Sequence, residues 1–165
     1  MGSGKSAVGI DLAVTLGYKF IDLDRHIELL EEASISEIFK EKGEIYFRKM
    51  ENRILKELLS SETKVLISTG GGTSCYGDTM SFITNQKDTV AIYLKVSVAV
   101  LVDRLFAERS KRPLIAHISD KTDLNDFIRK HLFERSFYYN QATFNIDAEN
   151  GSVKKIAEKI ISILF

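Results

Sequence analysis

The hydrophobic residues of this chain recur with two different periods, which alternate from the amino to the carboxyl end. Residues 5–16 carry apolar side chains at nearly helical spacing, namely Val8, Leu12, Ala13 and Leu16. Gly17 follows as a stop signal, and residues 18–23 then form an apolar run that predicts a strand. The chain is therefore predicted to begin with a helix and a strand, the latter delivering Asp22 and Asp24 at its end.

The same alternation continues to the last residue. Ser34 and Glu37 have the spacing of a capping box, which predicts a short helix to about Lys42. Further helices are predicted at 44–59, 80–85, 97–108 with Ser97 as cap, 123–139 and 152–164. Strands are predicted at 64–69, 89–95 and 142–147. The polar segment 110–122 is expected to be a mobile loop.

Strands that alternate with helices are typical of α/β proteins with a parallel sheet. In such sheets ligands bind at the carboxyl ends of the strands. The sequence therefore directs the search for function to the residues that follow each predicted strand, and to the glycine-rich start of the first helix.

The residues before the first helix match the second half of a phosphate-binding loop. Glycines allow backbone N–H groups to close around phosphate oxygens, and the helix that follows points its positive end at the same anion. Lys5 would reach the β- and γ-phosphates, and the Ser6 hydroxyl would bind Mg²⁺. A glycine-rich tail ahead of a capped helix is the alternative interpretation. The predicted nucleotide-binding residues are Gly2, Ser3, Gly4, Lys5, Ser6 and Ala7.

Two carboxylates lie one residue apart at the end of the first predicted strand. The period of a strand places Asp22 and Asp24 on the same face. Beside a phosphate loop, one carboxylate can hold Mg²⁺, usually through water, and the other can accept a proton from an acceptor hydroxyl. Taken alone, Asp24 is better interpreted as the N-cap of a following helix.

Composition narrows the class of protein. The chain has 165 residues, which suits one domain spanning 1–165, and its formal net charge is zero. A neutral chain is a poor candidate for nucleic-acid binding. The single cysteine, Cys75, permits no internal disulfide. No apolar run approaches the ~20 residues of a membrane span, and no signal region is seen, so we expect a cytoplasmic protein with no membrane partner.

Several short motifs in fixed order resemble the shikimate kinase family. They are the phosphate loop, F-I-D-L-D-x-x-I-E (20–28), G-E-x-x-F-R-x-x-E (43–51), the triple glycine Gly70-Gly71-Gly72, R-P-L (112–114) and E-R-x-x-x-Y (134–139). Each motif alone is weak, whereas their order and spacing cover nearly the whole chain. The resemblance implies a three-layer P-loop kinase fold with a lid at about 110–122, and transfer of the ATP γ-phosphoryl group to the 3-hydroxyl of shikimate with Mg²⁺ as cofactor. It also implies a monomer.

The resemblance assigns a role to each matching residue. Asp24 would bind the shikimate hydroxyls and lie nearest the attacking one, and Asp22 would hold Mg²⁺ through water. Arg112 would come from the lid to the nucleotide phosphates, with Pro113 stiffening the lid beside it. The shikimate carboxylate would lie between two arginines, and the glycine turn would line its pocket, with the Gly71 N–H offered to the substrate. These pocket residues are Arg48, Gly70, Gly71, Gly72 and Arg135.

Ordinary structural roles remain open for the same residues. Arg48 has the spacing for ion pairs with Glu44 or Glu51 on one helix. Arg112 and Arg135 would ordinarily be solvated cations, and a triple glycine is usually a flexible turn. Four aromatic residues on the 123–139 helix are interpreted as helix packing: Phe133, Phe137, Tyr138 and Tyr139.

Other activities compatible with the motifs are those of a gluconate or nucleoside monophosphate kinase, or of a nucleotide-binding remnant without turnover. The family resemblance includes a first strand, central in a sheet of order 2-3-1-4-5, and a first loop glycine, both of which would precede Met1. We therefore expect a gap in the sheet, low stability and weak ATP binding for the chain as written, with an internal methionine as the favoured explanation. The turn at 147–151, with Asn150, takes the place of the adenine-binding segment.

Overall fold

The computed structural model describes residues 2–112 and 114–165, and of Lys111 the backbone only. The role predicted for Pro113 falls outside the described residues. In chain order the elements are α1 (Lys5–Leu16), β1 (Lys19–Asp22), α2 (Leu23–Glu31), α3 (Ile35–Ser61), β2 (Val65–Ser68), η1 (Thr73–Cys75), α4 (Thr79–Asn85), β3 (Ile92–Lys95), α5 (Val98–Ala107), η2 (Arg109–Lys111), α6 (Lys121–Tyr139), β4 (Phe144–Asp147) and α7 (Val153–Leu164).

Local capping signals account for where the helices begin and end. Gly17 ends α1 in the left-handed conformation, and its N–H reaches the carbonyls of the last turn. The capping box of Ser34 and Glu37 forms as predicted, and Ser97 caps α5. The two helices predicted on either side of Gly43 are joined as α3, which is kinked there because Gly43 has a φ of 83°.

The strands form two parallel pairs instead of one continuous sheet. β1 pairs with β2, from Lys19 beside Val65 to Asp22 beside Ser68, and β3 pairs with β4 in the same manner. Within the described residues no strand pairs with both β2 and β3, so the two pairs are separate sheets. The predicted α/β class with parallel strands is confirmed, and the separation into two sheets agrees with the predicted gap.

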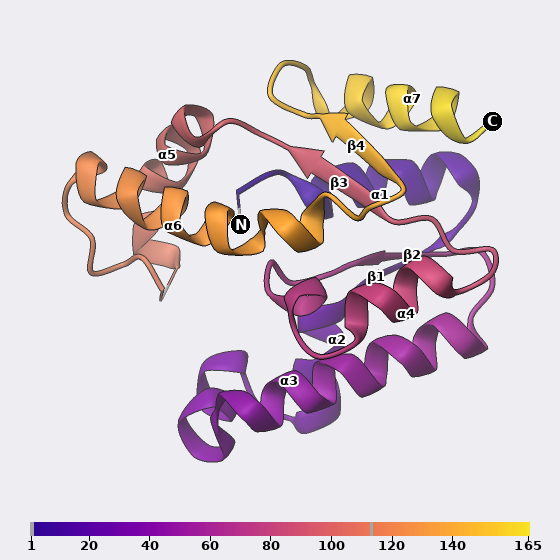
Figure 1. Ribbon diagram of the computed structural model, residues 1–165, viewed down its shortest axis with the longest axis horizontal. Helices are drawn as coiled ribbons and strands as arrows, with labels where there is room; N and C mark the ends of the chain where they lie inside the picture. Colours follow the sequence, from indigo (N-terminus) through magenta and orange to yellow (C-terminus); the bar gives the residue numbers. More distant parts are fainter. Residues whose placement is uncertain (1, 113) are drawn as a thin grey trace.

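Helix α1 packs against both pairs of strands. Figure 1 shows β3 and β4 with α5, α6 and α7 in one half of the molecule, and β1 and β2 with α2, α3 and α4 in the other. One core cluster contains Val8 and Leu12 of α1 together with apolar residues of β3, β4, α5 and α7. The other gathers β1, α2 and α3 around Ile27 and Leu55. Contacts of α1 with β1, β2 and α7 join the two halves.

Side-chain burial departs from the sequence-based expectations at two places. Most of the loop predicted at 110–122 lies between η2 and α6, yet its Ile115 and Ile118 are buried in the core cluster that contains α1. Conversely, Phe133 and Phe137 on α6 were expected to pack and are 84% and 72% exposed. Neither result can be read from local composition. Ile115 and Ile118 are two apolar residues in an otherwise polar segment, so nothing local indicates their burial. On α6, periodicity alone does not say which helix face packs against the core.

The buried isoleucine of this segment provides a test of the fold. We expect Ile115→Ala to lower the free energy of unfolding by about 3 kcal/mol, because the side chain is fully buried and its removal leaves a cavity. The measurement is urea unfolding followed by circular dichroism. Leu114→Ala is the matched control, since Leu114 is exposed and its truncation should change stability little. Equal effects of the two variants would show that the segment is not anchored in the core.

Candidate active site

The phosphate loop runs from Gly2 into the first turn of α1. Gly4 precedes the helix in the left-handed conformation, so the loop turns sharply into Lys5. Gly2 lies against the side chain of Leu105, close enough that an added methyl group would meet it at 3.0–3.2 Å. The loop is therefore packed onto α5, with the first N–H groups of α1 at its centre.

An arginine that sequence reasoning missed ties this loop to the turn after β4. Arg104 of α5 donates to the carbonyl of Gly2 and to that of Glu149, each at 3.4 Å. Glu149 also accepts a hydrogen bond from Ser97 at 2.5 Å. Arg104 thus links the turn at 147–151, which was expected to border the adenine, to Gly2 at the start of the phosphate loop.

The two predicted metal-binding residues are in direct contact. The Ser6 hydroxyl donates to Oδ2 of Asp22 at 2.9 Å and lies 3.4 Å from the hydroxyl of Ser68 at the end of β2. The other oxygen of Asp22 accepts from the N–H of Arg25 at 3.3 Å, so Asp22 is the N-cap of α2. The N-cap alternative for Asp24 is wrong, because the helix begins at Leu23, two residues earlier than that interpretation requires.

Asp24 lies in the first turn of α2, half-buried against the glycine turn. A methyl group on Gly70 would come within 3.0 Å of Oδ1 of Asp24 and 3.1 Å of Oε1 of Glu51. Burial raises the pKa of Asp24 to about 6, with the negative charges of Glu51 and Asp22 adding to the increase and Lys5 opposing it. A carboxylate with this pKa can exchange a proton near neutral pH.

Arg48 lies flat against the glycine turn and is fixed by two carboxylates. Its Nη1 donates to Oε2 of Glu51 at 2.8 Å, and its Nε is 3.5 Å from Oε1 of Glu44, so both of the ion pairs foreseen from the sequence form. A methyl group on Gly72 would lie 2.7 Å from Nη2 of Arg48. The guanidinium therefore needs glycine at that position to keep its place.

Glu51, which sequence reasoning gave no functional role, organises this corner. It is 1% exposed, and its second oxygen accepts a hydrogen bond from Thr73 at 2.5 Å. A buried carboxylate is costly unless it is paired and hydrogen-bonded, and Arg48 and Thr73 meet both conditions. The sequence feature that could have indicated this role is the position of Glu51, three residues after Arg48 and at the end of the motif G-E-x-x-F-R-x-x-E.

Arg135 approaches the same turn from α6. It lies beside the hydroxyl of Tyr139, which donates a hydrogen bond to the carbonyl of Gly71. Its charge is also felt by Cys75, whose pKa is raised by burial. A raised pKa disfavours the reactive thiolate form of Cys75.

Lys5 and Arg112 complete the arrangement. Burial lowers the pKa of the half-buried Lys5, while Asp24 and Asp22 oppose the shift and Arg112 and Arg135 add to it. These five side chains are therefore near enough to interact. Arg112 donates from Nη2 to Glu108 at 2.8 Å, and among the described residues nothing accepts a hydrogen bond from its buried Nε.

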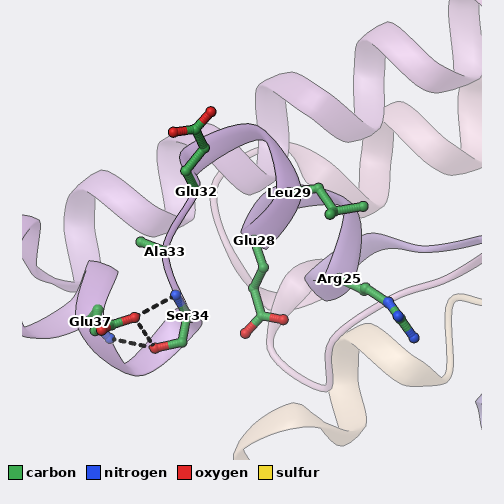
Figure 2. Close-up of a pocket in the computed structure, with 7 residues that line it drawn as sticks. All are labelled: Arg25, Glu28, Leu29, Glu32, Ala33, Ser34 and Glu37. Atoms are coloured by element: carbon green, nitrogen blue, oxygen red, sulfur yellow. Dashed lines mark hydrogen bonds between the residues drawn. The ribbon is translucent and has the colours of Figure 1, made fainter.

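Two hollows on the surface lie away from this cluster. Figure 2 shows one of about 320 Å³ between α2 and the start of α3, where the Ser34–Glu37 capping box forms one wall. The other, of about 350 Å³, lies beside Asp103 and Lys121. None of the predicted site residues lines either hollow. Acidic side chains dominate the first, which makes it unsuited to a phosphate.

Two further observations concern metals and membranes. Within the described residues, no three histidine, cysteine or acidic side chains are grouped so that they could hold a metal ion. Ser6 and Asp22 nevertheless offer the oxygen ligands that Mg²⁺ takes when phosphates and water complete its shell. Of the helices described, none has the length and apolar character to cross a membrane.

Comparison with known proteins gives a consistent result. The family model described as shikimate kinase matches residues 1–165. A shikimate kinase of Flavobacterium johnsoniae is 43% identical over 164 residues, which is 99% of this chain and 94% of that protein. One of Parabacteroides distasonis is 40% identical over 99% of this chain and 95% of that protein.

Solved structures agree. The crystal structure of shikimate kinase from Bacteroides thetaiotaomicron superposes with a TM-score of 0.89 at 33% identity, covering 99% of this chain and 93% of that one. Shikimate kinase from Acinetobacter baumannii, solved in complex with shikimate, gives 0.87 at 30% identity and covers 99% and 88%. With a family model matching the whole chain, relatives at 40–43% identity and a common fold, this chain belongs to the shikimate kinase family.

Proposed function

We propose that this protein transfers the γ-phosphoryl group of ATP to the 3-hydroxyl of shikimate, with the residues of the cluster above as its active site. One observation carries the proposal. Lys5 of the phosphate loop interacts with Asp24, and Asp24 lies against the glycine turn that also supports Arg48. This arrangement supports a site in which a phosphate-binding loop, a proton acceptor and a carboxylate-binding arginine act together, as a kinase for a hydroxy acid requires.

The nucleotide half of the site is proposed to work through fixed positive groups. The N–H groups of Gly4, Lys5, Ser6 and Ala7, at the positive end of α1, would bind the β- and γ-phosphates. Arg112 donates from Nη2 to Glu108, while its Nε has no acceptor among the described residues and could donate to a phosphate. Such groups stabilise the negative charge that develops on the transferring phosphoryl group.

The acceptor half is proposed to fix a planar carboxylate and one hydroxyl. Arg48 and Arg135 reach the glycine turn from different helices, and a guanidinium can bind a carboxylate through two parallel hydrogen bonds. Glu51 presets the orientation of Arg48 before any ligand arrives. The Gly71 N–H is proposed as a further donor to the substrate.

The chemical step then uses Asp24 as the proton acceptor. The 3-oxygen of shikimate forms a bond to the γ-phosphorus as the bond from that phosphorus to the β,γ-bridging oxygen breaks, releasing ADP. The hydroxyl proton passes to the Asp24 carboxylate, whose raised pKa suits that exchange. Mg²⁺ held by Ser6 and, through water, by Asp22 would neutralise phosphate charge.

We further propose that the protein is a cytoplasmic monomer. The support is that all the groups invoked above come from one chain, and that its net charge is zero with one cysteine. Light scattering after size exclusion tests the oligomeric state.

The activity itself is tested by ADP release coupled to NADH oxidation. With ATP and Mg²⁺ we expect turnover that depends on shikimate, because the two arginines and Asp24 select a carboxylate and a hydroxyl together. The methyl ester of shikimate is the matched control, since it keeps the hydroxyls and loses the charge that the arginines bind. Turnover of gluconate or AMP in preference to shikimate would overturn the proposal.

The pH dependence tests the role of Asp24. Since Asp24 accepts a proton only when ionised and its pKa is about 6, kcat/KM for shikimate should rise through pH 6 and level off above pH 7. Glu51→Gln should move the midpoint to lower pH, because it removes a negative charge that raises this pKa. Glu44→Gln, at the exposed partner of Arg48, should leave it in place. A midpoint indifferent to Glu51 would assign the titration to another group.

The contact between Arg48 and the glycine turn yields a separate test. Gly72 has φ −98° and ψ −15°, which alanine adopts readily, so Gly72→Ala acts through its methyl group on Arg48. We expect about a tenfold higher KM for shikimate, corresponding to roughly 1.4 kcal/mol, with KM for ATP unchanged. Ser74→Ala in the same turn is the control. An unchanged KM for shikimate would contradict the role of Arg48.

A further inference from the structure

Tyr139 makes a contact that none of the roles above uses. It is the last residue of α6, and its hydroxyl donates a hydrogen bond to the carbonyl of Gly71, 68 residues earlier in the chain. Gly71 lies between Gly70, which faces Asp24, and Gly72, which supports Arg48. The hydroxyl thus holds the middle of the turn on which the acceptor half of the site is built.

The ring of Tyr139 is fixed independently of its hydroxyl. Its centroid lies 4.9 Å from that of Tyr93 in β3, with the planes at 34°. Arg135 lies one helical turn earlier on α6, next to the same hydroxyl. Tyr139 is therefore held by the half of the molecule that contains β3, β4 and α6, and it bonds to the other half.

This contact matters because the two arginines proposed to bind the carboxylate come from different halves of the molecule. Arg48 belongs to the half with β1 and β2, whereas Arg135 belongs to the half with β3 and β4. A carboxylate bound by both arginines requires a fixed distance between the halves, and Tyr139 bonds across that boundary within one turn of Arg135.

We propose that Tyr139 is a positioning residue that sets the separation of Arg48 and Arg135, and through it the affinity for the acceptor carboxylate. The inference rests on the proposed function. Its physical basis is that three consecutive glycines have no side chains that could anchor the turn to α6, so the Tyr139 hydroxyl supplies that link through the Gly71 carbonyl. Tyr139 acts through the arginines and the turn, and it takes no part in the chemical step.

The experiment compares Tyr139→Phe with Tyr138→Phe. The first keeps the ring stacked on Tyr93 and removes only the donor. The second removes the hydroxyl of the adjacent, half-buried tyrosine, which is not assigned to the site. For each protein we would measure KM for shikimate and for ATP, kcat, and hydrogen–deuterium exchange of the peptide covering 69–75 without ligand.

We expect Tyr139→Phe to raise KM for shikimate about fivefold, the effect of one lost hydrogen bond, with kcat and KM for ATP within about twofold of the unaltered protein. The 69–75 peptide should exchange faster in this variant, and Tyr138→Phe should match the unaltered protein in every measurement. A fall in kcat with KM unchanged would overturn the proposal, as would unchanged exchange.

The design separates this proposal from the function on which it rests. If the unaltered protein fails to turn over shikimate while Tyr139→Phe still loosens the turn, the tether exists and the proposed function is wrong. If the unaltered protein is active and Tyr139→Phe behaves like it in both KM and exchange, the function holds and the positioning role is wrong.

Discussion

The close packing of α1 on the strands is the constraint on which the rest of the structure depends. A methyl group on Gly9 would lie 2.7 Å from the ring of Phe20 in β1 and 3.0 Å from Leu66 in β2, so only glycine lets the helix approach this near. On its other side α1 buries Val8 and Leu12 in the cluster shared with β3, β4 and α7. Because two strand pairs meet this one helix, its amino end, and with it the phosphate loop, is fixed relative to both.

The acceptor side is held by charge instead of apolar packing. Asp24, Glu51 and Asp22 repel one another, and burial adds to the penalty, as the raised pKa of Asp24 records. Arg48 and Lys5 offset part of this cost. Because the ionised form of Asp24 is disfavoured, this carboxylate is a stronger proton acceptor than an exposed one, and the same electrostatics favour a hydrogen bond to it from a hydroxyl group.

Local signals in the sequence predicted most of the fold. Gly17, the Ser34–Glu37 box and Ser97 end or begin helices where expected, because each acts within a few residues of its own position. What escaped prediction depends on distant partners. The burial of Ile115 requires a core assembled from other helices, and the bond from Tyr139 to Gly71 spans 68 residues. Neither the burial of Ile115 nor this hydrogen bond produces a periodic pattern of hydrophobic residues in the sequence.

The candidate site follows the same division. The motifs pointed to side chains that lie together in the structure, since Ser6 contacts Asp22 and Arg48 contacts the glycine turn. They indicated that Glu51 could pair with Arg48 on one helix, but not that Glu51 is buried, because a residue three positions away is as easily a surface partner as a buried one. The difference lies in burial: Glu51 is enclosed by α3 and the glycine turn, whereas Glu44 is exposed. The Arg48–Glu51 ion pair therefore does more than stabilise α3. Because the buried Glu51 holds the guanidinium in place, the remaining N–H groups of Arg48 point in one direction only.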